Sequence, residues 1–291
     1  MTEKPTRQQA KVLKAIQNQM ADMQRTVDRA EQQYDQSGES PTPGWHNNIH
    51  SRGRRHEELE RAAAAAGVPQ AWIEQVRVRG EHRLAWKAAL HWREPEPIDR
   101  QTLLDRLGDQ FRQVQDMAAV AAAYGEQAAQ LDPAAAALFD GRLWMLGQRA
   151  AAIAAVLKVS STEADQLWGD HTFTAAADSV RAAAPHALAW RWHDHTHSDI
   201  TDLALQATVL SAAGITGDLA RVPAPTPPEM VQRIPEILAR DPVPAAATEG
   251  GHSIATAVDA TGVTSGQQAE FDSGTPTPPV HSPAPVHGIE P

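Results

Sequence analysis

Several features that define whole classes of protein are missing from this sequence of 291 residues. It contains no cysteine, which excludes disulfides and thiolate chemistry and fits a reducing cytoplasm. No apolar run approaches the roughly 20 residues of a membrane-spanning helix, and the N-terminal residues are polar where a secretory signal peptide has its apolar stretch. We therefore expect a cytoplasmic protein that has no membrane partner.

Motifs of known chemistry are missing as well. The sequence has no glycine-rich phosphate-binding loop, no G-x-S-x-G nucleophile elbow and no zinc-binding cysteine pattern. Aromatic residues make up only 5% of the chain, so a core must be built largely from Ala, Leu and Val. These absences favour a non-enzymatic protein, and we predict no catalytic residue and no cofactor, apart from the divalent metal that one histidine pair suggests.

The charge of the chain is unevenly distributed. The net charge is −10, but residues 51–93 hold nine Lys and Arg against five Glu, a balance of +4, whereas residues 94–291 sum to −14, from eleven cations against twenty-five carboxylates. Because an acidic surface repels phosphates, a DNA-binding role can lie only in the first third of the chain.

Periodic apolar residues predict an all-α fold. Across residues 13–34 they are spaced alternately three and four apart, which is the pattern of a coiled-coil seam. The seam consists of Leu13, Ile16, Met20, Met23, Val27, Ala30 and Tyr34. This helix can pair with its own copy in a homo-oligomer or fold back on a helix of the same chain, and we favour the homo-oligomer.

Breaks in the periodic pattern divide the chain into segments. Residues 1–37 are predicted to form the coiled-coil helix, and residues 38–54, rich in Pro, Gly, Ser and Thr, a linker in which His46 and His50 do not share a helix. The remaining segments are a basic segment at 55–93, an Ala-rich helical bundle at 98–220, and a Pro-rich, mostly disordered tail at 221–291 with one short helix at 229–240.

Capping residues mark helix boundaries inside the predicted bundle. Asp99 and Asp132 each precede a long apolar stripe, and Ser160 with Glu163 forms a capping box. That box belongs to a helical corner over residues 153–168. The second helix of this corner is acidic and would repel phosphates, so we interpret it as part of the fold.

The basic segment is predicted to contain two helices that meet at a tight corner. Residues 57–66 contain no helix breaker, and Gly67 is placed to end that helix in a left-handed conformation. A second helix follows Pro69, because proline is tolerated in a first helical turn. A short turn of this kind sets two helices at about 90–120° to each other.

A further short helix is predicted over residues 81–93, after the second helix ends at Gly80. It would carry Trp86, Leu90 and Trp92. Aromatic side chains beside arginines can stack on bases. Tryptophans at this spacing more often belong to a core or an interface, and we favour that interpretation.

The corner resembles the helix-turn-helix motif of DNA-binding proteins. Such motifs have a small residue on the first helix, a glycine in the turn, and apolar residues that pack the second helix back. Those places are filled here by Ala63, Gly67, Val68, Ile73 and Val76. The resemblance implies a DNA-binding or DNA-associated protein whose partner is double-stranded DNA. The candidate contacts are Arg77, Arg79 and Arg83 to phosphates, with Gln70 and Gln75 to bases.

The amino-acid composition of the chain also resembles that of a group of bacterial proteins. Arginine outnumbers lysine 21 to 5 and alanine is abundant, as expected from a GC-rich genome. Together with the run AGVPQAWIEQVRVRG at residues 66–80, this resembles actinobacterial proteins, including those carried on plasmids and phages. The resemblance spans residues 50–125 and implies no activity.

Two other classes of function stay open. The corner can equally be a helical hairpin with a solvated charged face, and the coiled coil and Pro-rich tail would then suit a protein interaction or scaffold protein.

A metal-dependent helical-bundle enzyme is the second alternative. His193 and His197 lie one helical turn apart, the spacing at which paired imidazoles hold a divalent metal. The pair resembles the HxxxH motif of DinB-type metalloproteins, which implies a third histidine, to be supplied by His171, His91 or His82. HD phosphohydrolases also share the order of His171, His193-Asp194 and Asp218.

Overall fold

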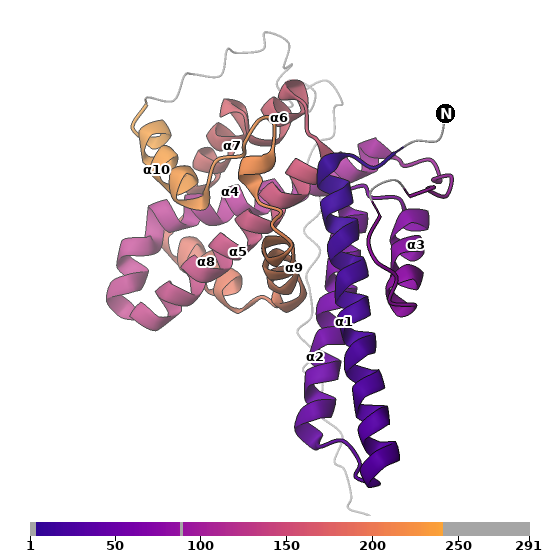
Figure 1. Ribbon diagram of the computed structural model, residues 1–291. Coiled ribbons are helices and arrows are strands. Elements are labelled where there is room, and N and C mark those ends of the chain that lie inside the picture. The colour runs from indigo at the N-terminus through magenta and orange to yellow at the C-terminus, as the bar shows by residue number, and fades with distance from the viewer. Residues whose placement is uncertain (1–3, 88–89, 241–291) are drawn as a thin grey trace, which may run out of the picture. The chain divides into compact units, whose positions relative to one another are not determined.

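The computed structural model describes residues 4–87 and 90–240, which belong to one compact unit. Within those residues the chain forms ten α-helices and one short 3-10 helix, without a strand, so the all-α prediction is confirmed (Figure 1). No helix in this part of the chain is long and apolar enough to cross a membrane. Residues 241–291 of the tail that was predicted to be mostly disordered lie outside the described residues.

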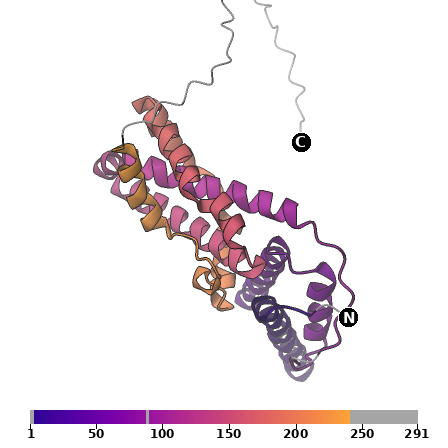
Figure 2. The same ribbon diagram turned by 90° about the horizontal axis from the view of Figure 1, so that it is seen from above.

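The first three helices form a hairpin with a third helix at its side. Helices α1 (Arg7–Ser37) and α2 (Pro43–Ala65) run antiparallel, and α3 (Gln70–Glu81) lies alongside the first half of α1 (Figures 1 and 2). The approach of α3 depends on Gly80, because a Cβ there would lie 2.6 Å from the backbone oxygen of Gln17. Only glycine therefore allows the two helices to pack this closely.

The coiled-coil seam on α1 is covered over its first half and open over its second. Leu13 and Ile16 are fully buried, whereas Tyr34 is 51% exposed. Helix α3 covers only the first half, so beyond it α1 packs against α2 alone (Figure 1). The first half of the seam has therefore folded back within the chain. A homo-oligomer was predicted to form through residues 13–34. Only the part of the seam from Met23 to Tyr34 remains open for such pairing, and the homo-oligomer stays a prediction.

The linker predicted at residues 38–54 is wrong for most of its length, because α2 begins at Pro43. Thr42 caps the helix by accepting a hydrogen bond from a backbone N–H of the first turn, and Pro43 has no N–H that needs a partner. The composition pointed to a loop, but proline directly after threonine is also a helix start. His46 and His50 consequently do lie on one helix, four residues apart.

The rest of the described chain forms a helical bundle around two long helices. Asp99 and Asp132 cap α4 and α5 as predicted, and the capping box of Ser160 with Glu163 opens α6. The bundle consists of α4 (Arg100–Leu131), α5 (Pro133–Leu157), α6 (Ser161–Trp168), α7 (Asp170–Arg181), α8 (Pro185–His197), α9 (Thr201–Ala212), η1 (Gly217–Leu219) and α10 (Pro227–Leu238).

The bundle extends further than its predicted end at residue 220. Met230 and Ile234 of α10 are buried, so this helix is part of the core rather than the start of the tail predicted at 221–291. A capping box formed by Thr226 and Glu229 starts the helix in spite of the prolines around it. The predicted end of the bundle was wrong because the proline content of this segment was given more weight than the short apolar stripe on the helix.

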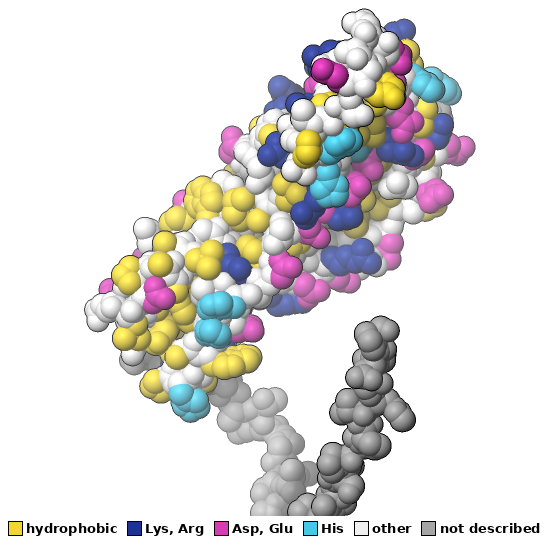
Figure 3. Space-filling view, turned by 90° about the horizontal axis from the view of Figure 1, so that it is seen from below, with side chains coloured by type: hydrophobic (Ala, Val, Ile, Leu, Met, Phe, Trp, Pro, Cys, Tyr) yellow, Lys and Arg dark blue, Asp and Glu magenta, His cyan; other side chains and the backbone are white. Residues whose placement is uncertain are grey.

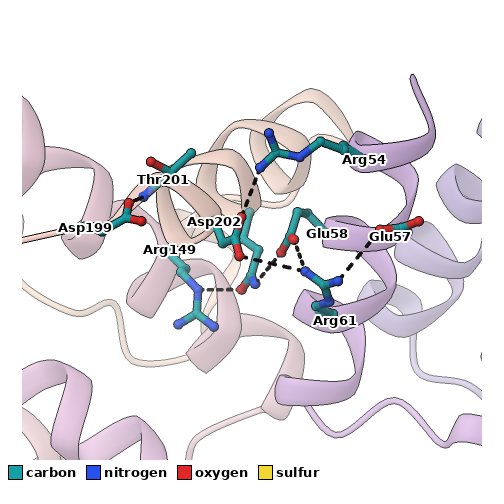
Figure 4. Close-up of polar contacts among 9 residues, drawn as sticks. Arg54, Glu57, Glu58, Arg61, Arg149, Asp199, Thr201 and Asp202 are labelled. Carbon is teal, nitrogen blue, oxygen red and sulfur yellow. Dashed lines mark hydrogen bonds and ion pairs between the residues drawn. The ribbon is translucent and has the colours of Figure 1, made fainter. Parts of the chain in front are cut away.

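A buried polar network joins the hairpin to the bundle. Gln206 of α9 donates a hydrogen bond of 2.7 Å to Glu58 of α2 and accepts one of 2.7 Å from Arg149 of α5 (Figure 4). All three side chains are at most 5% exposed. Burial lowers the pKa of Arg149 to about 10, against the opposing charge of Glu58, so the guanidinium stays protonated at neutral pH. At the solvent edge, Arg54 pairs with Asp202 at 3.1 Å.

Candidate nucleic-acid interface

The turn between α2 and α3 has the local backbone that the sequence predicted, but the two helices do not cross at the 90–120° of a helix-turn-helix. Helix α3 runs in the same direction as α1, with Gly67 next to Gln9 and Gly80 next to Gln17, so it is antiparallel to α2 and forms the helical hairpin that was the alternative. Gly67 has a φ of +73°, and the backbone N–H of Val68 donates to the carbonyl of Ala63 at 3.0 Å. Ala63, Val68, Ile73 and Val76 are all buried beneath the corner. These contacts confirm the local packing. They do not bear on DNA contact, which depends on the outward-facing side chains.

The arginines predicted to contact phosphate are paired with carboxylates of the same chain. Arg77 donates hydrogen bonds to Glu74 at 2.7 Å and to Glu81 at 2.9 Å, and the hydrogen bond to Glu74 is the main reason why the pKa of Arg77 is raised. Arg83 forms an ion pair with Asp28 of α1. Because these positive charges are already compensated, they have little to offer a phosphate backbone.

Two other predicted contact residues hold the connection between α3 and α4. The side chain of Gln75 donates to the carbonyl of His91 at 2.8 Å and accepts from the backbone N–H of Arg93 at 3.0 Å. Arg79 donates to the carbonyl of Ala85 at 3.0 Å. Of the five predicted residues, only Gln70 is exposed without a side-chain hydrogen bond within the described residues.

The short helix predicted over residues 81–93 is wrong. After α3 ends at Glu81, residues 82–87 and 90–99 contain no helix. Arg83 has a φ of +57°, which stops the helix. Polar groups of neighbouring helices then bind the backbone: Gln17 donates to the carbonyl of Leu84 at 2.6 Å. These long-range hydrogen bonds replace the local ones that a helix would make.

Three tryptophans form a column from the core to the surface, which confirms the core prediction for Trp92. Trp72 is 1% exposed and Trp92 is 5% exposed, with ring centroids 5.5 Å apart. The ring of Trp86, which is half-buried, lies 6.1 Å from that of Trp92. The indole N–H of Trp72 donates to the carbonyl of Arg93 at 2.9 Å, which fixes the buried end of the column.

The outer end of this column forms part of a cavity lined by cations, here called the basic pocket. Its volume is about 500 Å³. It is lined by Lys4, Pro5, Arg7, Ala10, Lys11, Lys14, Trp86, Leu90 and Trp92. The four cations follow one stripe of α1 and the residues before it, spaced three, four and three apart. No carboxylate is among these lining residues, so the cavity is strongly positive.

The cations of the basic pocket are largely unpaired. Lys11 donates to the carbonyl of Gly214 at 2.5 Å, which orients the ammonium without neutralising it. Lys4, Arg7 and Lys14 form no ion pair within residues 4–87 and 90–240. One feature of the sequence indicates this site: neither residues 4–14 nor residues 84–93 contain an Asp or Glu. The zero net charge of residues 1–50 concealed it.

The predicted metal pair is present on one helix face but lacks further ligands. The rings of His193 and His197 lie 4.0 Å apart on the exposed side of α8, and Nδ1 of His197 is 2.8 Å from the carbonyl oxygen of His193. No group of three or more His, Cys, Asp or Glu that could hold a metal occurs in the described residues.

The structure therefore does not bring the expected partners to this pair. Neither the third histidine implied by the DinB-type resemblance, from His171, His91 or His82, nor the set implied by the HD resemblance, with Asp218, is assembled. Binding of a divalent metal by the pair alone stays a prediction.

The neighbouring His195 belongs to an ionic cluster that the sequence did not indicate. Its Nε2 lies 2.9 Å from Oδ2 of Asp116 on α4, and Arg191 pairs with the other oxygen of that carboxylate. Burial tends to raise the pKa of Asp116, but the hydrogen bond with His195 and the charge of Arg191 outweigh this and lower it. The cluster fastens α8 to α4.

Replacing Asp116 by asparagine should make the protein less sensitive to acid. Because its folded pKa is below the ordinary value of 3.8, the ionised carboxylate stabilises the fold above that value, and the contribution is lost as the pH falls through the folded pKa. In thermal melts from about pH 5 down to about pH 2, the wild type should lose stability more steeply than the variant below about pH 4. Asp109→Asn, in an exposed pair with Arg112, is the control. Parallel pH profiles for wild type and Asp116→Asn would contradict the assignment.

Comparison with protein family models, with curated proteins and with solved structures finds no match for this chain.

Proposed function

We propose that this protein binds nucleic acid without acting on it chemically, and that it does so through the basic pocket. The observation that carries the proposal is the stripe of four cations facing an indole with no carboxylate among the lining residues. Lysine and arginine side chains supply most of the affinity for a phosphate backbone, and aromatic rings add stacking on bases. In an otherwise acidic chain, cations beside an aromatic ring favour nucleic acid as the ligand, because it offers both phosphates and bases.

The exposed face of α3 is a poorer candidate for the same role. Glu74 and Glu81 flank Arg77 on that face and would repel phosphates. The connection between α3 and α4 also crosses the helix, because Gln75 and Trp72 bind its backbone. The corner is therefore proposed to position the connection and its tryptophans.

Reversing two charges of the basic pocket tests the proposal. We expect the wild type to bind a labelled duplex with a single-stranded overhang, measured by fluorescence anisotropy. With about four phosphate contacts, affinity should fall on the order of 100-fold between about 50 and 200 mM salt. Arg7→Glu with Lys14→Glu should weaken binding at least about tenfold at low salt and flatten the salt dependence.

Two arginines further along α1 provide a matched control. Arg25→Glu with Arg29→Glu makes the same change in net charge on the same helix, away from the pocket, and should cause a much smaller loss of affinity. Arg77→Ala should leave binding nearly unchanged. Equal losses from both double variants would point to non-specific attraction, and unchanged binding by Arg7→Glu with Lys14→Glu would refute the proposal.

A protein interaction role is favoured by a different surface. On the face shown in Figure 3, hydrophobic side chains gather over the bundle, while charged side chains are denser over the hairpin. Large apolar residues exposed on the bundle helices include Leu138 at 48%, Trp144 at 41% and Trp190 at 66%. Co-purification of a protein partner would favour this alternative if the preparation contains no nucleic acid. The nucleic-acid content is read from the ratio of the absorbance at the nucleic-acid maximum to that at the protein maximum.

A further inference from the structure

We infer that the basic pocket receives an unstacked base together with its flanking phosphates, so that its ligand is a single-stranded segment of nucleic acid. The inference rests on the proposed function and adds to it the state of the strand. It depends on three features of the pocket: a fixed aromatic platform, cations spaced along one line, and a cavity of limited size.

The platform is Trp86, which is held from behind. Its ring contacts Trp92, whose ring in turn lies against the buried Trp72. An indole supported in this way loses little further freedom when a base stacks on it, which favours binding. Stacking of a base on an aromatic ring is tolerant of sequence, because every base has a π-face.

The backbone around Trp86 is also held in place. Gln17 of α1 binds the carbonyl of Leu84, and Arg79 of α3 binds that of Ala85, both directly before the tryptophan. Gln75 fixes the backbone at His91 and Arg93 on the other side. Side chains from two helices thus hold both flanks of the pocket wall.

The cations lie in a line that suits a strand. Arg7, Lys11 and Lys14 follow one face of α1, and at about 1.5 Å of rise per residue Arg7 and Lys14 are about 10 Å apart along the helix axis. That length covers at most about three nucleotide steps, since stacked nucleotides advance roughly 3.4 Å each and an unstacked strand extends further per step. A short strand can therefore place successive phosphates on the stripe while one base turns towards Trp86.

The size of the cavity argues against duplex as the preferred ligand. A volume of about 500 Å³ is in the range of sites for small molecules. Bases in a duplex are stacked and paired, so presenting one to Trp86 would require unstacking it at a cost that a single strand avoids. On α3 the connection bound by Gln75 crosses the helix, and the face that stays exposed carries Glu74 and Glu81, so α3 is poorly suited to enter a major groove.

Oligonucleotides of defined strand state test the inference on the full-length protein. We expect a ten-residue oligothymidine or oligouridine to bind at least about tenfold more tightly than a hairpin duplex of equal length, at the same low salt. Whichever of the two single strands binds more tightly identifies DNA or RNA as the source of the ligand, and either result supports the inference.

Variants of Trp86 locate the contact. Trp86→Ala should weaken binding of the single strand by about tenfold, and Trp86→Phe should recover most of the loss because a ring remains for stacking. Trp144→Ala, which removes an exposed tryptophan of α5, should change nothing. Thermal melts of each variant establish that it is folded.

The possible failures separate the inference from the proposed function. Duplex and single strand binding equally, with Trp86→Ala unchanged, would overturn the inference and leave nucleic-acid binding by the cations intact. A Trp86→Phe variant as weak as Trp86→Ala would overturn stacking as the mode of contact. Absence of binding to every oligonucleotide at low salt would overturn both.

Discussion

Replacing Trp72 by alanine should lower the free energy of unfolding by about 3–5 kcal/mol, measured by chemical denaturation. The side chain is 1% exposed, packs against Trp92, and is part of the continuous core. Truncation would leave a cavity under the connection between α3 and α4 and release the backbone at Arg93. Trp144→Ala, at a position that is 41% exposed, should change stability by less than about 1 kcal/mol.

A second substitution at the same position separates packing from hydrogen bonding. Trp72→Phe keeps an aromatic ring but removes the N–H that binds the carbonyl of Arg93. It should be less destabilising than Trp72→Ala and should leave that carbonyl without its partner, a loss of about 1–3 kcal/mol. If Trp72→Ala were no more destabilising than Trp144→Ala, the tryptophan column would not be what holds the connection in place.

Replacing Arg149 by methionine should lower the free energy of unfolding by about 3 kcal/mol. The guanidinium donates to Gln206 and Gln110, and Gln206 in turn donates to the buried Glu58. Methionine fills much of the volume but leaves the side-chain oxygens of Gln206 and Gln110 without their donor and removes the buried positive charge near Glu58. Arg54→Met, which removes an exposed pair with Asp202, should cost less than about 1 kcal/mol.

The network can also be removed as a whole. A triple variant with Glu58→Leu, Arg149→Met and Gln206→Leu should recover most of the stability lost in Arg149→Met, because the three buried polar side chains are removed together and Gln110, which is only half-buried, can bind water instead. Failure of the triple variant to recover would mean that shape, rather than polar pairing, governs this junction. A neutral effect of Arg149→Met alone would contradict the role assigned to the network.

Apolar spacing and capping residues predicted most of the helices. Asp99 and Asp132 open α4 and α5, and Gly67 closes the turn after α2, because caps act within a few residues of sequence. The errors came where two local rules conflict. Proline marks both a loop and a first helical turn, so the first half of α2 was placed in a linker, and α10, although predicted as a short helix, was assigned to the tail.

The candidate site was harder to predict, because the role of a charged side chain depends on its neighbours in space. The sequence marked Arg77 and Gln75 as contact residues, yet the first is paired with glutamates and the second binds the backbone at His91 and Arg93. The stripe from Lys4 to Lys14 went unnoticed because acidic residues later in α1 balance its charge in a sum over sequence. They do not line the pocket.

By itself the sequence determined the all-α class, the corner at Gly67 and the starts of α4 and α5. Each of these depends on backbone preferences or on a periodicity within a few turns. Only the tertiary structure decided that α3 covers half of the seam, that Glu58 is buried beside Arg149 through Gln206, and that Trp86 meets the stripe on α1. Contacts between residues tens of positions apart depend on how whole helices pack, and that packing leaves no regular spacing in the sequence.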